Sequence, residues 1–328
     1  MLAAFRPVVA LLPLLVAVPA FAEDDAGGPA RTRSFTFHYG ATLKDLPAGE
    51  TVRVWLPVPP TNEHQRVELT GSDLPGEATV GAEEKYGNTM LYFQAQPRDD
   101  GTLPFKLTYR VSRDEVRAIE GQPSAAELPS EQREFFLQPD ALVPVDGRPL
   151  ELIAELDLAD EPLARARQLY DRVNDHMRYS KEGTGWGQGD VIWACDSRYG
   201  NCTDFHSLFI SLARAEDLPA RFEMGFPLPP ERGQGKVAGY HCWAFFHLDG
   251  RGWVPVDISE ADKHPELTDY YFGNLTEDRL TFSSGRDLTL VPEQAGEPLN
   301  FFIYPYAEVA GEPLPKTSIE LDFSYEDH

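Results

Sequence analysis

The sequence has 328 residues, of which 29 are basic and 53 acidic, so the formal net charge at pH 7 is −24. A surface this negative repels phosphate backbones and anionic lipid headgroups, which argues against nucleic acid and acidic membranes as partners. The length favours two domains, each with room for a hydrophobic core.

Residues 1–22 have the features of a secretory signal peptide. Arg6 supplies a positive charge, the stretch from Val8 to Val18 is almost wholly apolar, and Ala20-Phe21-Ala22 has the small-x-small form of a cleavage site. An uncleaved anchor is the alternative, but the run is short for a membrane span and is interrupted by proline. We therefore expect an exported protein, periplasmic or extracellular, that has no membrane insertion after cleavage.

The region from 30 to 120 is expected to be an antiparallel β-sandwich domain. Apolar and polar residues alternate over Phe35–Tyr39, Val52–Val58 and Phe105–Val111, which is the pattern of half-buried strands. Glycine and proline punctuate these runs as turns. The segment 121–159 loses the alternation and is expected to be a surface connector.

Residues 160–328 combine helical and strand patterns, so the predicted fold class is α+β. A helix is expected to start at Asp160, a candidate N-cap. A glycine-rich loop from 183 to 189 follows, and an amphipathic helix with one apolar side begins near Asn201. Strands return from Gly239 onward, and the last of them could rejoin the N-terminal strands.

Cys202 lies in the first turn of that second helix, directly after Gly200 and Asn201. The positive end of a helix dipole and the unpaired amides of the first turn stabilise a thiolate, which makes such a cysteine a candidate nucleophile. Position alone also fits a small buried apolar residue. The assignment therefore depends on whether the chain supplies a base.

The segment from His241 to Asp257 predicts a strand, a tight turn at 249–252 and a second strand. Antiparallel pairing could bring the imidazole and the carboxylate to one face of the sheet. If the turn centres on Gly250 and Arg251, the two are about three residues out of opposition, so a bulge or a diagonal contact is required. A carboxylate there would orient the imidazole as it takes the thiol proton.

Four segments together resemble the transglutaminase-like superfamily in order and spacing: Gly200–Phe209, Leu218–Arg221, Tyr240–Trp243 and Gly252–Asp257. The resemblance implies a papain-like α+β domain in which Cys202 is the nucleophile, His241 the base and Asp257 the orienting acid. It covers about residues 163–287. The N-terminal strands only look like the β-sandwich often attached to such domains.

An acyl-transfer site also needs donors for the developing oxyanion. The backbone N–H of Cys202 is the first candidate, and Trp186, Gln188 and Trp193 are candidates for the second. Packing roles for the two tryptophans and a solvated Gln188 fit the sequence equally well.

No metal and no cofactor is expected. Five side chains could be drawn as a metal cluster: Cys195, Cys202, His206, His241 and Cys242. Their spacing matches neither a Cys-x-x-Cys nor a paired-histidine motif, so we expect His206 to form hydrogen bonds in the core beside the site. An acidic run is expected to be a solvated loop rather than a calcium site: Glu260, Asp262 and Glu266.

The expected function is thiol-dependent acyl chemistry on peptide or amide bonds through a thioester, of the peptidase, amidase or transglutaminase type. Hydrolysis is favoured over amine transfer because water is the default second nucleophile. The alternative is a non-catalytic envelope binding or scaffold protein that retains the fold. A peptide or protein is the expected partner, and the sequence does not indicate the oligomeric state.

Three cysteines are an odd number for an oxidising compartment. Because Cys242 follows His241 on a strand, its thiol is expected to point away from the chemistry. We expect a disulfide between Cys195 and Cys242 that leaves Cys202 free. A bridge from Cys195 to Cys202, or no bridge, remains the alternative.

Overall fold

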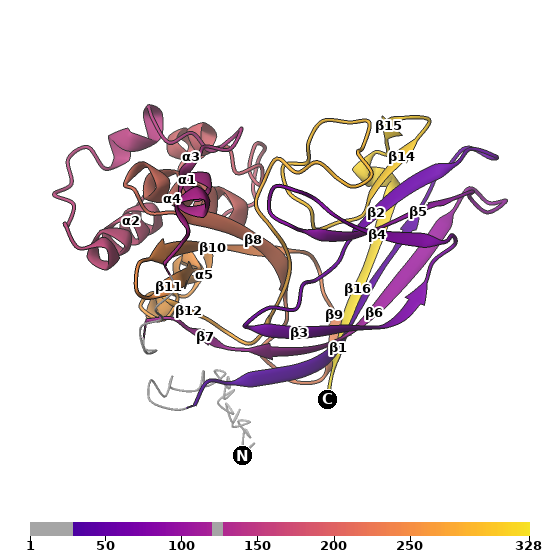
Figure 1. Cartoon of the computed structure of the whole chain (residues 1–328), viewed down its shortest axis with the longest axis horizontal. Coiled ribbons are helices and arrows are strands. Elements are labelled where there is room, and N and C mark those ends of the chain that lie inside the picture. Colours follow the sequence, from indigo (N-terminus) through magenta and orange to yellow (C-terminus); the bar gives the residue numbers. More distant parts are fainter. Residues whose placement is uncertain (1–28, 120–126) are drawn as a thin grey trace, which may run out of the picture.

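The computed structural model describes residues 29–119 and 127–328, and the predicted signal peptide lies outside this part of the chain. The chain folds into a strand-rich part and a part where helices cover a sheet (Figure 1). This mixture confirms the predicted α+β class.

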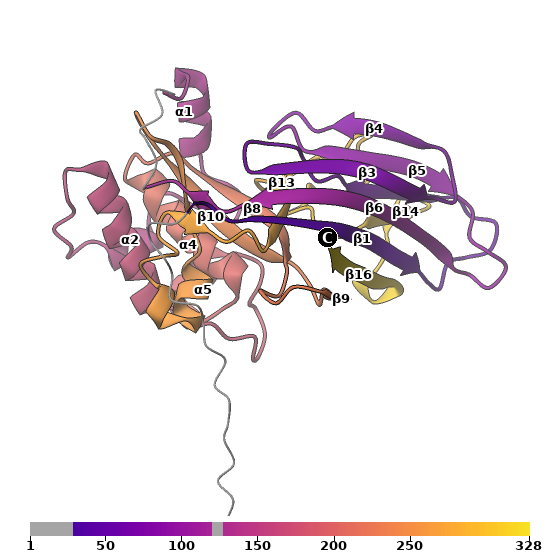
Figure 2. The same cartoon turned by 90° about the horizontal axis from the view of Figure 1, so that it is seen from below.

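Two five-stranded antiparallel sheets form the strand-rich part. The first has the order β3 (Gln65–Asp73), β6 (Leu103–Asp114), β1 (Thr32–Leu43), β16 (Ile319–Asp327) and β9 (Gln234–Lys236). The second has the order β15 (Glu312–Pro313), β14 (Tyr306–Val309), β2 (Val52–Pro57), β5 (Thr89–Ala95) and β4 (Ala78–Ala82). Both appear as neighbouring layers in Figure 2.

The alternating apolar residues of these strands point into a shared core. Phe35 and Phe37 of β1 are fully buried, as are Val52 and Val54 of β2. Phe93 of β5 meets a β6 ring across the two sheets at a centroid distance of 5.8 Å. The period-two pattern therefore identified the buried faces of these strands.

The strand-rich part takes strands from both ends of the chain. Tyr39 of β1 pairs with Phe323 of β16, and Val54 of β2 pairs with Ala307 of β14. The short β9, which comes from the middle of the chain, pairs with β16 on its other side. Each sheet is therefore assembled from segments distant in sequence.

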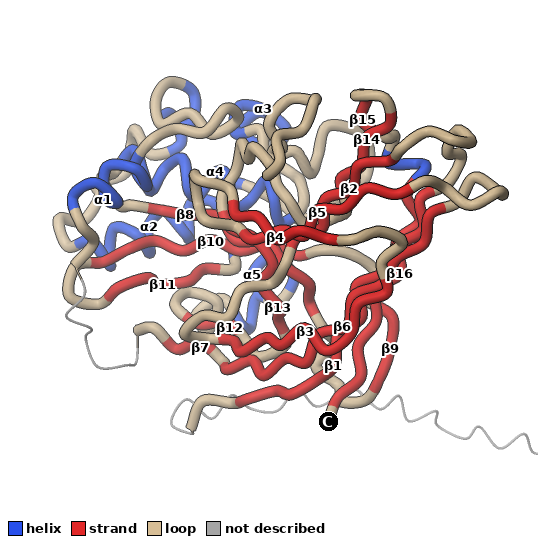
Figure 3. Tube along the Cα trace, turned by 45° about the vertical axis from the view of Figure 1, so that its right-hand side comes forward, coloured by secondary structure: helices blue, strands red, loops and turns tan. Residues whose placement is uncertain are grey.

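A four-stranded antiparallel sheet carries the site. Its order is β11 (Gly252–Val256), β10 (His241–Leu248), β8 (Ala220–Pro227) and β13 (Arg279–Ser284). The helices around it are α2 (Pro162–His176), α3 (Val191–Ser197), α4 (Cys202–Ala215) and α5 (Ile258–Lys263). Figure 3 shows these helices beside the strands of this sheet. A two-stranded ladder joins β7 (Val116–Arg117) to β12 (Asn274–Leu275).

Helix α4 differs from the predicted one-sided helix, because every residue from Cys202 to Arg214 is buried. The sheet covers one side, and α2, α3 and the 3-10 helix η1 (Arg148–Leu152) contact the rest. Its polar residues have partners inside, such as Ser207, which accepts a hydrogen bond from Arg286. The helix therefore crosses the core.

One local expectation was wrong. The segment predicted as a surface connector contains helix α1 (Ser130–Leu137), which has no buried residue, and η1, and both contact α4. Helix α2 is capped one residue later than expected, because the carboxylate of Glu161, and not Asp160, accepts from Ala164 N at 2.7 Å. Two further 3-10 turns are η2 (Pro265–Leu267) and η3 (Lys316–Ser318).

Candidate active site

The thiol of Cys202 lies at the first residue of α4. Asn201 is the N-cap, and its side chain accepts a hydrogen bond from Thr203 N at 2.9 Å. The side chain of Asp204 in turn accepts a hydrogen bond from Asn201 N at 2.9 Å, which completes a capping box. Both bonds fix the start of the helix, where Cys202 is the first residue.

Asp204 also connects the helix to the glycine-rich loop before it. Its carboxylate accepts from Gly187 N at 2.7 Å and from Gly189 N at 2.9 Å. Gly200 must be a glycine, because a Cβ there would lie 2.4 Å from the Asp204 carboxylate. This buried carboxylate therefore fixes the loop, the turn and the start of α4 to one another.

His241 begins β10, and Asp257 follows the last residue of β11. Ala244 pairs with Val256, so extending the register leaves the imidazole and the carboxylate diagonal to each other. The diagonal contact is close, since His241 Nε2 lies 2.6 Å from Asp257 Oδ2. Of the two routes that the sequence allowed, the structure uses the diagonal one, with no bulge between β10 and β11.

Asp257 is held from several sides. It is the N-cap of α5, and its Oδ1 accepts from Glu260 N and from Ser259 Oγ, each at 3.1 Å. Its Oδ2 receives Arg279 Nη2 at 2.7 Å, and both side chains are buried. Burial alone would raise the pKa of Asp257, but His241 and Arg279 hold it far below its usual range. The carboxylate is therefore ionised and fixed in direction.

Sequence reasoning missed Arg279, which begins β13 and lies outside the motifs that carry the resemblance. Its guanidinium also stacks over the ring of Trp243 at 5.3 Å. The one local signal was a charged residue at the start of a strand whose following residues are largely buried. That signal did not say which acid the arginine would meet.

The thiol and the imidazole form a polarised pair. Burial opposes ionisation of Cys202, but hydrogen bonds with Cys242 and His241 outweigh it and hold the pKa of the thiol well below 9.0. Burial also disfavours the imidazolium, yet Asp257 and Cys202 raise the pKa of His241 from 6.5 to about 9. With Nε2 bonded to Asp257, Nδ1 is the ring nitrogen left for the thiol. Both shifts favour a thiolate beside an imidazolium over the neutral pair.

His206 lies in the core beside the site and joins its two halves. Its Nδ1 is 2.7 Å from the Cys202 carbonyl, and its Nε2 accepts from Ile258 N at 3.0 Å. Because Nε2 accepts, the proton sits on Nδ1 and the ring is neutral. Burial lowers the pKa of His206 to about 4, which agrees with this tautomer. The ring therefore links the backbone of the nucleophile to the backbone that follows Asp257.

The expected disulfide between Cys195 and Cys242 is absent, and all three cysteines are free thiols. The sulfur of Cys242 faces α4, where it lies 3.8 Å from both Thr203 Oγ1 and His206 Nδ1. Cys242 therefore points towards the chemistry and not away from it. Side chains do alternate along β10, as assumed. However, the face to which Cys242 points is the one that α4 covers, and α4 begins beside the start of β10.

The three side chains considered for the second oxyanion donor lie in different surroundings. The indole of Trp186 donates to Gly183 O at 3.3 Å, and Trp193 packs edge-on against Tyr199. Gln188 is exposed. The two tryptophans thus have contacts that anchor the loop.

One group of possible metal ligands occurs in the described residues, namely His241, Asp257 and Glu260. Glu260 Oε1 lies 3.6 Å from His241 Nε2, and Arg279 already places a cation on Asp257. Of the other two residues in the acidic run, Asp262 accepts from Tyr179 N at 2.8 Å. The group therefore extends the charge network around the imidazole.

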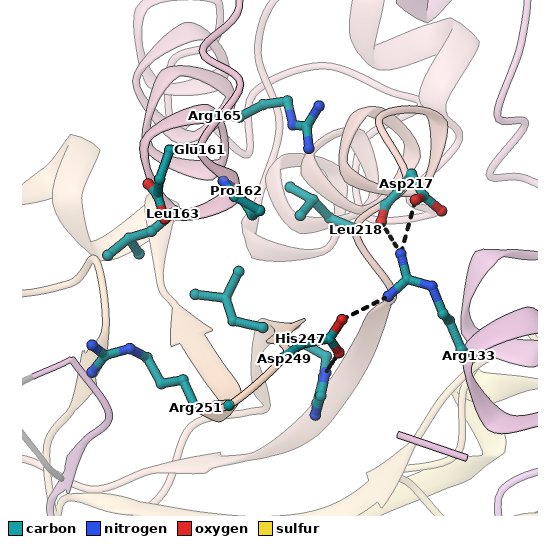
Figure 4. A pocket seen from close by; sticks show the side chains of 12 residues that line it. Arg133, Glu161, Pro162, Leu163, Arg165, Asp217, Leu218, His247, Asp249 and Arg251 are labelled. Atoms are coloured by element: carbon teal, nitrogen blue, oxygen red, sulfur yellow. Dashed lines mark hydrogen bonds and ion pairs between the residues drawn. The ribbon is translucent and has the colours of Figure 1, made fainter. Parts of the chain in front are cut away.

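A cavity of about 490 Å³ lies at the other end of β10, around His247 and the turn into β11 (Figure 4). Arg133 spans its side, with contacts of 2.9 Å to Asp217 and 3.9 Å to Asp249. Six residues of extended strand, roughly 20 Å, separate it from His241. This cavity is therefore not part of the Cys202 site.

Comparisons with known proteins concern the family and the fold of the part that carries this site. Residues 151–258 match the model of the transglutaminase-like superfamily, so the chain carries a domain of this superfamily and the resemblance is confirmed. An uncharacterized protein of Haemophilus influenzae is 29% identical to this chain, and the match covers 87% of this chain and 88% of that protein.

A solved structure shares the fold at low sequence identity. A protein from Cytophaga hutchinsonii, described as a candidate cysteine protease, is 16% identical with a TM-score of 0.57 over 90% of this chain and 98% of that chain. The periplasmic domain of TgpA from Pseudomonas aeruginosa is 17% identical over 72% of this chain and 90% of that chain, with a TM-score of 0.40.

Proposed function

We propose that the protein is a thiol-dependent acyl hydrolase that acts on peptide or amide bonds, with Cys202 as nucleophile, His241 as general acid and base, and Asp257 as the orienting acid. The observation that carries this proposal is the 2.6 Å contact between His241 Nε2 and Asp257, made beside a thiol at a helix N-terminus. Together these groups form the arrangement that generates a thiolate at neutral pH.

In the first step, the thiolate adds to the carbonyl carbon, and the His241 imidazolium protonates the leaving nitrogen as the C–N bond breaks. The acyl group remains on Cys202 as a thioester. In the second step, neutral His241 takes a proton from water, and the hydroxide attacks the thioester. The acid leaves, and the thiolate and imidazolium are restored.

The oxyanion formed in each addition needs two donors. The amide of Cys202 is the first, because a first-turn N–H has no acceptor within its own helix. Gln188 is the second donor that we propose, because the loop carrying it is tied to α4 through Asp204. We also propose that residues 1–22 are removed on export, which mass spectrometry of the mature N-terminus would test.

The decisive experiment is incubation of the purified protein with a peptide library, with and without a primary amine, followed by mass spectrometry. We expect peptides to be cut or deamidated, and the amine to compete poorly with water. Efficient joining of the amine would identify a transglutaminase instead. The Cys202→Ala variant should lose all product, and Cys195→Ala, which removes another buried thiol, should not.

If the wild type and both variants give no product and Cys202 reacts with no thiol-directed probe, the proposal fails. In that case the protein is better explained as a binding or scaffold protein that retains the fold.

A further inference from the structure

A largely apolar cavity of about 370 Å³ lies between residues 299–307 and the last strands. Its walls include Phe301, Ile303, Leu314 and Ile319. Leu321, which also lines the cavity, is 38% exposed. The cavity therefore offers an uncovered apolar surface that a ligand could fill.

Tyr304 connects this cavity to the site. It lines the cavity, its hydroxyl lies 3.3 Å from Tyr240 N, and the two tyrosine rings meet edge-on. The Tyr240 hydroxyl in turn lies 3.0 Å from both Asn201 Nδ2 and Thr203 Oγ1, the residues on either side of Cys202. The wall of the cavity is therefore only two side chains away from the nucleophile.

Gln188 forms a second connection on another side. It lines the cavity, and its carbonyl accepts from Asn300 Nδ2 at 2.7 Å. The glycines on both sides of it donate to Asp204 in the first turn of α4. The cavity mouth and the oxyanion side of the site thus share one anchored loop.

We propose that this cavity, here called the Tyr304 pocket, binds a large uncharged apolar side chain of the peptide substrate, next to the bond that Cys202 attacks. The proposal rests on the proposed function and adds a substrate class to it. Lys316 is the one charged residue among those that line the pocket, so an acidic or basic side chain would lose water without gaining a buried partner.

The shape of the pocket favours a side chain over a larger partner. Its volume is at the lower end of the range for small-molecule sites, which suits one aromatic or branched aliphatic group. Docking of another folded protein would instead need a broad complementary face of about 800 Å² on each partner. The pocket is a recess joined to the start of α4 through Tyr304 and Tyr240, a position that suits a substrate side chain near the scissile bond.

The test uses the Cys202→Ala protein, so that binding is measured without turnover. Fluorescently labelled hexapeptides, of alanine except for one scanned Phe, Leu, Ser or Asp, are titrated by fluorescence anisotropy. We expect the Phe and Leu peptides to bind about 10-fold or more tightly than the Ser and Asp peptides, as burial of a large apolar side chain implies.

Leu321→Arg in the same background should remove this preference. Leu69→Arg, at a 46% exposed leucine on β3, is the matched control and should retain it. Equal binding of all peptides, or an intact preference in Leu321→Arg with an unchanged melting temperature, would overturn the proposal. A preference that persists although Cys202 of the wild type proves unreactive would instead refute the proposed function and leave the pocket as a peptide-binding site.

Discussion

The pairing of Cys202 with His241 predicts a specific pH dependence of alkylation. A thiol with the ordinary pKa of 9.0 is ionised at pH 6 in about one molecule in 1000. If the thiolate is already formed, its fraction at pH 6 rises at most about 1000-fold. A more acidic thiol is intrinsically less nucleophilic, which cancels about half of that gain on a logarithmic scale. The net expectation is an alkylation rate about 30-fold above that of an ordinary thiol.

The measurement is iodoacetamide labelling of the folded protein from pH 5 to 10, with each cysteine followed by peptide mass spectrometry. Cys202 should react at a nearly constant rate between pH 6 and 8. Cys195 should stay unlabelled there, because burial raises its pKa to about 11. Burial and the neighbouring Cys202 also raise the pKa of Cys242. Only one of the three thiols should therefore be modified.

His241→Gln removes the imidazolium and should slow labelling of Cys202 at pH 6 by about 30-fold. His247→Gln, at the far end of the same strand, is the matched control and should leave the profile unchanged. The reasoning is refuted if wild-type labelling rises as one curve centred near pH 9 and the His241→Gln profile coincides with it.

Three further predictions concern the groups around the pair. Asp257→Asn should lower turnover by about 10⁴. Because this change also leaves Arg279 buried without its carboxylate partner, it should lower the free energy of unfolding by about 3–5 kcal/mol. An unchanged urea midpoint would contradict the buried ion pair. Burial lowers the pKa of His206 from 6.5 in the unfolded chain to about 4 in the folded protein, so the neutral ring stabilises the fold fully above pH 6.5, and this stability is lost as the pH falls towards 4. The loss amounts to about 3 kcal/mol. His206→Gln should therefore show a shallower slope of the free energy of unfolding against pH between about 4 and 6.5. Gly200→Ala would force a Cβ against Asp204, and disruption of the cap should cost about 1–2 kcal/mol, measured as a lower melting temperature; unimpaired stability would show that the turn can shift.

Local sequence was sufficient for some of these features because their causes are local. The capping residues around Cys202 are neighbours in the chain, and a helix start of this kind forms from residues three apart. The hairpin that brings His241 towards Asp257 likewise depends on one short turn. Both features could be predicted before any tertiary contact was known.

Other features depend on how distant elements pack, and the sequence pattern cannot supply that information. Arg279 reaches Asp257 only because β13 lies in the same sheet as β10. The direction of Cys242 was mispredicted because alternation gives two faces but does not say which face a helix will cover. The missing disulfide has the same cause, since its prediction relied on Cys242 facing away from α4.

The pairing of β1 with β16 has a consequence for the order in which the chain can fold. Arg33 and Asp327 form an ion pair although they are 294 positions apart. Until β16 pairs with it, the flank of β1 that β16 covers has unpaired backbone groups. Contacts of such long range form slowly, and an open strand edge is where nascent chains associate with one another. Loss of β16 should therefore be seen first as aggregation of chains that have not yet folded, before any defect in the chemistry of Cys202 could be measured.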